Sequence, residues 1–132
     1  MKKKKKVPLR KIIRRLEKKA DKAVSLYIRK RDSKVADNKC VICKVNPIQC
    51  AFHIVRRGRK ILRWDPRNIV ATCHRCNYIE YRNPDISRAF FIREYGVELY
   101  LKLVDDSQND FESTIENLEE IIKKFEKELK EL

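Results

Sequence analysis

Two stretches of the chain carry an apolar residue at every third or fourth position, and each predicts an amphipathic α-helix. In residues 9–31 the apolar positions step by 4, 3, 4, 3 and 4, at Leu9, Ile13, Leu16, Ala20, Ala23 and Tyr27. In residues 111–132 they step by 3, 4, 3, 4 and 3, at Ile115, Leu118, Ile122, Phe125, Leu129 and Leu132. Each helix therefore has a narrow apolar seam along one side, with similar spacing in both, and the two helices differ in charge. We expect them to pack antiparallel in one chain. A homodimer through the C-terminal seam is the alternative, because such a seam does not specify its partner.

The middle of the chain alternates short apolar runs with turn residues, which is typical of strands. Residues 48–55 mix β-branched and aromatic side chains and predict one strand, and residues 61–64 predict a second, shorter one. A basic turn, residues 56–60, separates them, and Asp65-Pro66-Arg67-Asn68 is a strong turn sequence. Residues 69–72 are expected to lead into a pair of cysteines, after which a helix begins.

Pro84 suits the first turn of a further helix and Gly96 suits its end. We therefore expect a helix over 84–95, followed by a short buried helix up to residue 104. A chain of 132 residues is one domain by its length, and the pattern places it in the α+β class, mostly helical. The expected parts are a basic disordered tail at 1–8, a basic helix at 9–31, a cysteine-bracketed module at 40–82, a helical extension at 84–104 and an amphipathic C-terminal helix at 111–132.

Charge changes the picture of the first helix. The net charge is +14, with 17 Lys or Arg against 4 Asp or Glu in residues 1–39 and 4 against 10 in residues 105–132. Such an excess favours a nucleic-acid partner, and the acidic end is also expected to attract the basic one. Only Glu17 and Asp21 offset the cations of residues 9–31, so the basic face is either a phosphate-binding surface or a solvated one. No apolar run approaches 18 residues and no secretory segment is present, which predicts a cytoplasmic protein outside the membrane.

Two cysteine pairs, each with two intervening residues, have the spacing at which four thiolates close a tetrahedron around zinc. The predicted zinc ligands are Cys40, Cys43, Cys73 and Cys76. Residues 44–72 separate the pairs, which is more than the roughly 15–20 residues of a simple zinc ribbon, so the pairs enclose a structured insert. Cys50 is expected to be a packed small residue, and His74 an exposed phosphate contact.

The insert holds one histidine, His53, and asparagines follow at Asn68 and Asn77. Framed by the cysteine pairs, these three residues resemble the HNH (ββα-metal) endonucleases, in the variant whose third position is asparagine. Two further segments resemble the NinG/Rap recombination proteins of lambdoid phages more closely: Leu62-Arg63-Trp64-Asp65-Pro66-Arg67-Asn68-Ile69-Val70 and Cys73-His74-Arg75-Cys76-Asn77. The similarity extends to residues 22–32, to residues 94–98 and to the charged final helix.

The resemblance implies a zinc-stapled ββα-metal module in a phage-encoded or prokaryotic protein that cuts branched or recombination DNA. His53 would act as the general base that deprotonates the attacking water. Asn77 would bind a catalytic Mg²⁺ or Mn²⁺ ion, and Asn68 would hold the loop that orients the base. The cations expected to grip DNA phosphates are Arg56, Arg57, Arg59, Lys60, Arg63 and Arg75.

One position departs from the HNH pattern. The residue before the histidine is Phe52, where these nucleases usually carry a carboxylate or histidine as a second metal ligand. Asp65 and Glu80 are the nearby carboxylates in the sequence. Two other functions therefore stay open: a non-catalytic, zinc-containing DNA-binding accessory factor of recombination, and a basic zinc-knuckle protein of RNA or the translation machinery.

Overall fold

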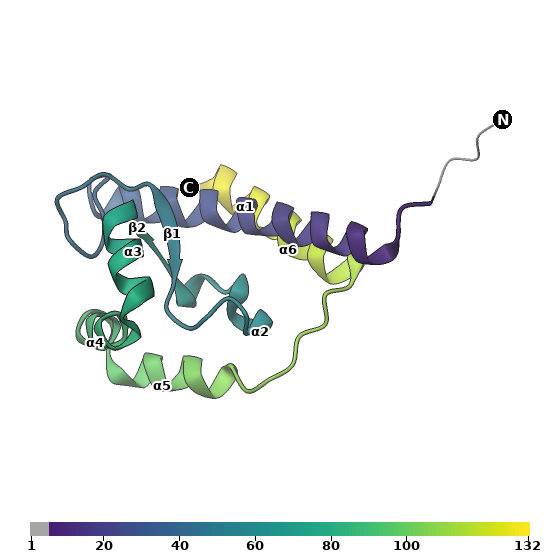
Figure 1. Ribbon diagram of the computed structural model, residues 1–132. Coiled ribbons are helices and arrows are strands. Elements are labelled where there is room, and N and C mark those ends of the chain that lie inside the picture. Colours follow the sequence, from purple (N-terminus) through teal and green to yellow (C-terminus); the bar gives the residue numbers. More distant parts are fainter. Residues whose placement is uncertain (1–5) are drawn as a thin grey trace.

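The computed structural model describes residues 6–132, apart from the side chains of residues 80–82 (Figure 1). Residues 1–5 of the predicted basic tail, and the side chain of Glu80, lie outside the described part. The chain is mostly helical with one small antiparallel sheet, as the sequence predicts. In order, the elements are α1 (Leu9–Val35), β1 (Cys50–His53), α2 (Lys60–Arg63), the 3₁₀-helix η1 (Pro66–Asn68), β2 (Ile69–Thr72), α3 (His74–Arg82), α4 (Pro84–Tyr95), α5 (Val97–Asp106) and α6 (Ile115–Glu131).

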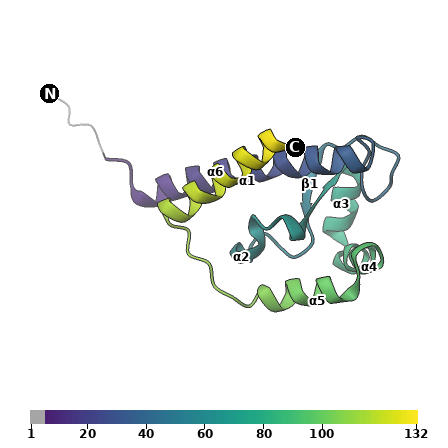
Figure 2. The ribbon, with the colours of Figure 1, turned by 180° about the vertical axis from the view of Figure 1, so that it is seen from behind.

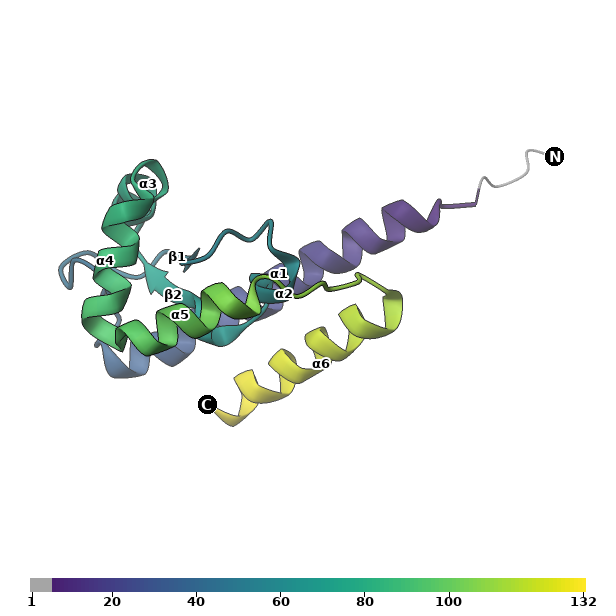
Figure 3. The same cartoon turned by 90° about the horizontal axis from the view of Figure 1, so that it is seen from below.

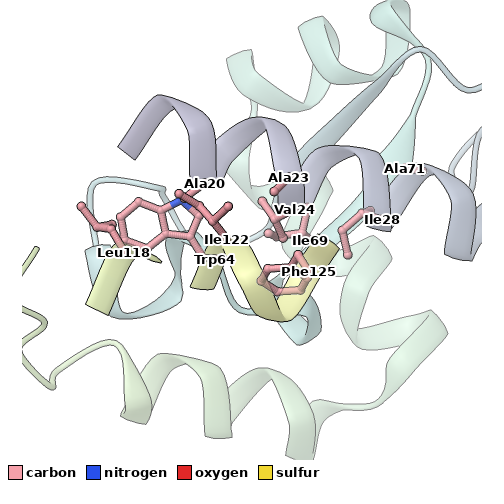
Figure 4. Packing of buried hydrophobic residues seen from close by; sticks show 10 residues of the cluster. All are labelled: Ala20, Ala23, Val24, Ile28, Trp64, Ile69, Ala71, Leu118, Ile122 and Phe125. Atoms are coloured by element: carbon pink, nitrogen blue, oxygen red, sulfur yellow. The ribbon is translucent and has the colours of Figure 1, made fainter. Parts of the chain in front are cut away.

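The main core lies between α1, α6 and the sheet (Figure 4). The seam residues of the two helices meet there, and the ring of Tyr27 lies 5.4 Å from that of Phe125. Trp64 and two β2 residues, Ile69 and Ala71, close the same core from the other side. Its buried members are Ala20, Ala23, Val24, Ile28, Trp64, Ile69, Ala71, Leu118, Ile122 and Phe125. The C-terminal seam is therefore covered by α1 of the same chain.

The two long helices run parallel, so the antiparallel prediction is wrong (Figures 1 and 3). Ser113, just before α6, donates a hydrogen bond to Glu17 in the first half of α1, while Lys30 near the end of α1 reaches the carbonyl of Leu129. The reason is the path of the chain: α5 runs back along the far side of the molecule, and residues 107–114 then return to the start of α1 (Figure 2). Opposite charge does not set the direction, since no ion pair joins α1 to α6 along their described lengths.

The two strands pair antiparallel, with Cys50 opposite Thr72 and His53 opposite Ile69. The second strand is thus residues 69–72, and the strand expected at 61–64 is instead the short helix α2. Leu62 packs into a small core against α4 and α5, whereas Trp64 packs into the main core. Residues two apart share one face of a strand but point to nearly opposite sides of a helix, so a helical turn lets these two side chains enter different cores.

The small second core holds α4 and α5 beneath the sheet region, around Leu62, Phe91 and Leu103. As predicted, α4 begins at Pro84 and ends at Tyr95, just before Gly96, whose φ of 94° is a conformation that side-chain-bearing residues rarely adopt. The next helix, α5, continues to Asp106, slightly beyond its expected end. Within residues 6–132, no helix combines the length and the apolar character needed to cross a lipid bilayer.

Candidate metal centre and histidine pocket

The predicted zinc ligands converge from two parts of the chain. Cys40 and Cys43 lie in the loop after α1, Cys73 directly follows β2, and Cys76 lies in the first turn of α3. Their Sγ atoms are all within 4.8 Å of one another, and Sγ of Cys43 lies 3.9 Å from Sγ of Cys73. Zinc with bonds of about 2.3 Å to four sulfurs would hold them roughly 3.8 Å apart. The cluster could therefore hold a structural metal ion such as zinc.

Neighbouring N–H groups favour the charged form of two of these thiols. Burial by itself raises the pKa of Cys73, but the backbone N–H of Cys76 and the side-chain amide of Asn46 donate to its sulfur, and the pKa falls to about 6. The backbone N–H of Asn46 likewise donates to Cys43 and lowers the pKa of that thiol. Asn46 was not anticipated, although its position three residues after Cys43 in a tight knuckle is a signal. Thiolate is the form that binds a metal ion.

The remaining cysteine and the second histidine stay outside the cluster. Cys50 is half-buried in β1, and its thiol bonds to the carbonyl and hydroxyl oxygens of Thr72, both at 3.3 Å. His74 is exposed, and its backbone N–H donates to the side chain of Gln49. Neither side chain belongs to the four-sulfur group.

His53 and Asn77 line the same pocket, of about 690 Å³, next to the cysteine cluster. His53 is the last residue of β1, and Asn77 follows Cys76 on the first turns of α3. Arg56 and Arg57, from the loop after β1, also line it. The strand pair and the helix that follows therefore bring a base, an amide oxygen and two cations to one cavity.

The imidazole of His53 has a defined orientation. Its Nε2 lies 2.8 Å from the backbone carbonyl oxygen of Arg63, which can only accept, so Nε2 carries the proton and Nδ1 keeps a free lone pair. Burial, followed by the nearby charge of Arg57, lowers the pKa of His53 from the ordinary value of 6.5. At neutral pH the ring is therefore uncharged and its Nδ1 can take up a proton.

Asn68 ties down the loop that follows His53. Its side chain is fully buried, accepts from the backbone N–H of Val55 at 2.8 Å, and donates to the carbonyls of Val55 and Leu62. These bonds hold the two ends of residues 55–62 together, so the loop carrying Arg56 and Arg57 has fixed ends. Asn68 itself does not line the pocket.

The pocket offers no carboxylate among its described lining side chains. Phe52, only 8% exposed, lines it next to His53 and offers no ligand atom. Asp65 is turned elsewhere: it caps η1 through the N–H of Arg67 and pairs with the Arg67 guanidinium at 2.7 Å. Among the described side chains, the oxygen donors here are Asn77 and Ser87.

The six predicted phosphate-binding cations divide into two groups. In the first group, Arg63 donates to the carboxylate of Asp21 in α1 with two nitrogens, at 2.9 and 2.7 Å. Arg57 donates to the same carboxylate at 2.7 Å, and Lys60 pairs with Glu17 at 3.0 Å. The exposed cations Arg56, Arg59 and Arg75 make no ion pair with any described side chain. The first group is therefore partly neutralised by α1, while the second is free to contact a partner.

Asp21 is a second residue that sequence reasoning did not single out. Besides the two arginines, it accepts from the indole N–H of Trp64 at 2.9 Å. Because the carbonyl of Arg63 also receives the His53 hydrogen bond, Asp21 links α1 to the orientation of His53. In sequence it was recognisable only as one of two acids within a strongly basic helix.

These features define a small, mostly helical protein in which a four-cysteine cluster adjoins a pocket containing a histidine and an asparagine. The chain belongs to the NinG family: the model described as "Bacteriophage Lambda NinG protein" matches residues 1–132. This membership indicates a phage protein related to recombination. No curated protein and no solved structure matches the chain.

Proposed function

We propose that this protein is a metal-dependent, structure-selective endonuclease of the HNH type that hydrolyses phosphodiester bonds in branched or recombination DNA. The observation that carries the proposal is that His53 and Asn77, from a strand and a following helix, line one pocket. The order of β1, β2 and α3, stapled by the cysteine cluster, supports an HNH-like module. Family membership supports recombination DNA as the substrate class.

In this proposal Nδ1 of His53 takes a proton from a water molecule, whose oxygen attacks the phosphorus. The bond between phosphorus and the leaving oxygen breaks, and that oxygen takes a proton from water. The hydrogen bond from Nε2 to Arg63 keeps Nδ1 in the base form and holds the ring in place. Arg56 and Arg57 bind the flanking phosphates, and Asn68 fixes the loop on which they lie.

A divalent ion such as Mg²⁺ or Mn²⁺ would neutralise charge on the phosphate as it develops. Asn77 would hold the ion through its amide oxygen, a hard ligand for a hard cation. Mg²⁺ commonly keeps several waters and takes few protein ligands alongside substrate phosphates, so this sparse set of donors fits it. The four cysteines would hold zinc as a structural ion.

The test is nicking of a labelled branched oligonucleotide in Mg²⁺ or Mn²⁺. We expect His53→Ala to lower the rate by about 100-fold or more while binding is unchanged, since the base acts on the chemical step. Asn77→Ala should raise the metal concentration needed for half-maximal rate, and Asn77→Asp should lower it. Asn109→Ala is the matched control for Asn77→Ala, because this exposed asparagine lies outside the pocket, and it should nick normally.

Phe52 favours a second candidate, a zinc-containing DNA-binding accessory factor without catalysis. The two candidates give different results in one experiment. Tight binding of branched DNA with no nicking in Mg²⁺, Mn²⁺, Co²⁺ or Ni²⁺ would replace the endonuclease by the accessory factor. Stronger binding to structured RNA than to branched DNA would contradict both.

A further inference from the structure

The outward face of α1 carries a row of cations. At about 100° per residue, positions 11, 14, 15, 18, 22 and 29 all fall within about 100° of one another around the helix axis, so these cations lie along one side. Five are exposed and the last, Arg29, is half-buried. We call these residues the α1 stripe: Lys11, Arg14, Arg15, Lys18, Lys22 and Arg29.

The acids of α1 do not neutralise the stripe, because they point into the molecule. Glu17 pairs with Lys60, Asp21 bonds Arg57 and Arg63, and buried Asp32 accepts from the backbone N–H of Ala71. No stripe residue makes an ion pair with a described side chain. The acidic helix α6 packs on the opposite, apolar side of α1 and leaves the stripe uncovered.

The stripe leads to the histidine pocket. A second cavity, of about 300 Å³, lies between α1 and β1, and its α1 side is formed by Asp21, Val24, Ser25 and Arg29. His53, Ala51 and Arg57 line this cavity and the 690 Å³ pocket alike. The stripe therefore adjoins a cavity that also contains His53, and the acid in that cavity, Asp21, is already bonded to Arg57 and Arg63.

Resting on the proposed function, we propose that the α1 stripe binds the sugar–phosphate backbone of one duplex arm of the DNA, with the bond to be cut at His53. From Lys11 to Arg29 the stripe extends about 27 Å at 1.5 Å per residue. At about 3.4 Å per base pair this corresponds to roughly eight base pairs. Lysine and arginine without partner acids are the groups that bind phosphates regardless of sequence. Contact along one arm places the branch point beside the base.

The test compares two quadruple variants of the full-length protein that lose the same net charge. Lys11, Arg14, Lys18 and Lys22 are changed to Gln in the stripe variant, and Lys123, Lys124, Lys127 and Lys130 of α6 in the control; all eight are exposed. Glutamine has nearly the helix propensity of lysine and arginine, so both variants should keep the fold. Binding of a fluorescent three-way DNA junction is followed by anisotropy in Ca²⁺, between 50 and 200 mM salt.

We expect the stripe variant to bind at least about tenfold more weakly at 100 mM salt. The slope of log K against log salt should become shallower by about 3 to 4, since each phosphate contact contributes about 0.9. The α6 control should bind within about twofold of the unchanged protein. Equal losses in the two variants, or an unchanged slope in the stripe variant, would overturn the proposal.

Arm length gives a second readout. When the arms of the junction are shortened one at a time, the unchanged protein should lose affinity once a particular arm falls below roughly eight base pairs. The stripe variant should be insensitive to that arm. Affinity that does not depend on any arm, or that is higher for an RNA duplex of the same length, would contradict the proposal. Because binding is measured without cleavage, failure of the proposed nuclease activity would show separately, as absent nicking by a protein that still binds through α1.

Discussion

The cysteine cluster and the histidine pocket are neighbours, joined where Asn77 follows Cys76, yet they are assembled differently. The cluster uses two short motifs, and each ligand has another ligand three positions away in the sequence. The pocket draws on β1, the loop after it, α3 and α4, and the histidine is oriented through α2 by Asp21 of α1. A site made from two local motifs depends on its ligands, whereas a site assembled from many elements depends also on residues that do not line it, here Asn68 and Asp21.

The largest expected effect is on the cluster. Cys40→Ser removes one sulfur ligand, and structural zinc contributes on the order of 10 kcal/mol in small domains. We expect the bound zinc to fall from about one ion per chain and residues 40–82 to lose their folded structure, measured by elemental analysis and amide NMR. Cys50→Ser, outside the cluster, should keep both the bound zinc and the folded structure of residues 40–82. A folded, zinc-free Cys40→Ser protein would contradict a metal-dependent scaffold.

Asn68→Ala tests whether the pocket depends on residues outside it. It leaves the part-buried backbone groups of Val55 and the buried carbonyl of Leu62 without their partner, which should destabilise the protein by about 2–4 kcal/mol in chemical unfolding. Nicking should decrease more than DNA binding, because the loop after His53 loses its anchor. The comparison variant is Asn46→Ala, beside the cluster. It loses one side-chain hydrogen bond to the sulfur of Cys73, and we expect the free energy of unfolding to fall by about 1 kcal/mol. If the two variants lost the same amount of stability, the distinction between the two sites would be removed.

Asp21→Asn tests the link from α1 to His53. The change keeps the shape of the side chain but removes the negative charge to which Arg57, Arg63 and Trp64 donate hydrogen bonds. We expect the free energy of unfolding to fall by about 1–3 kcal/mol and nicking to become slower. The charge of Asp21 raises the pKa of His53, so without it the acidic limb of the pH–rate profile should move to lower pH. Asp85→Asn is the control. This carboxylate is 80% exposed and pairs only with Arg88 among described side chains, so we expect the variant to lose at most about 0.5 kcal/mol of stability. If the pH–rate profile of Asp21→Asn were the same as that of the unchanged protein, Asp21 would not influence His53.

The smallest effect concerns pH and stability. Burial lowers the pKa of His53 below 6.5, so the unfolded chain binds the proton more readily than the folded one. The stability contribution of the neutral ring is complete above pH 6.5 and decreases as the pH falls from there through the folded-state pKa. His53→Gln can keep a hydrogen bond to Arg63 without titrating. The difference in unfolding free energy between the two proteins should therefore shift in favour of the variant below pH 6.5, and a pH-independent difference would refute a buried neutral histidine.

The comparison also explains which predictions could be made in advance. Helices α1, α4 and α6 and the ligand cluster were anticipated because helical spacing, Pro84, Gly96 and the paired cysteines are signals carried within a few residues. The segment 61–64 was misassigned because β-branched and aromatic residues suggest a strand, whereas Leu62 and Trp64 pack into separate cores. Likewise, Arg57 and Arg63 read as free cations until the fold brought Asp21 against them.

Sequence was sufficient for the helices α1, α4 and α6, the charge distribution and the cysteine set, because each depends on contacts between near neighbours or on composition. The parallel direction of α6, the true second strand and the neutralisation of half the basic loop required the three-dimensional arrangement. Each of these depends on where a distant segment comes to lie, and that is settled by which buried surfaces fit together. Opposite charges on two exposed helices interact too weakly across water to choose a direction, whereas the return path of α5 and the packing of Phe125 against Tyr27 do choose it.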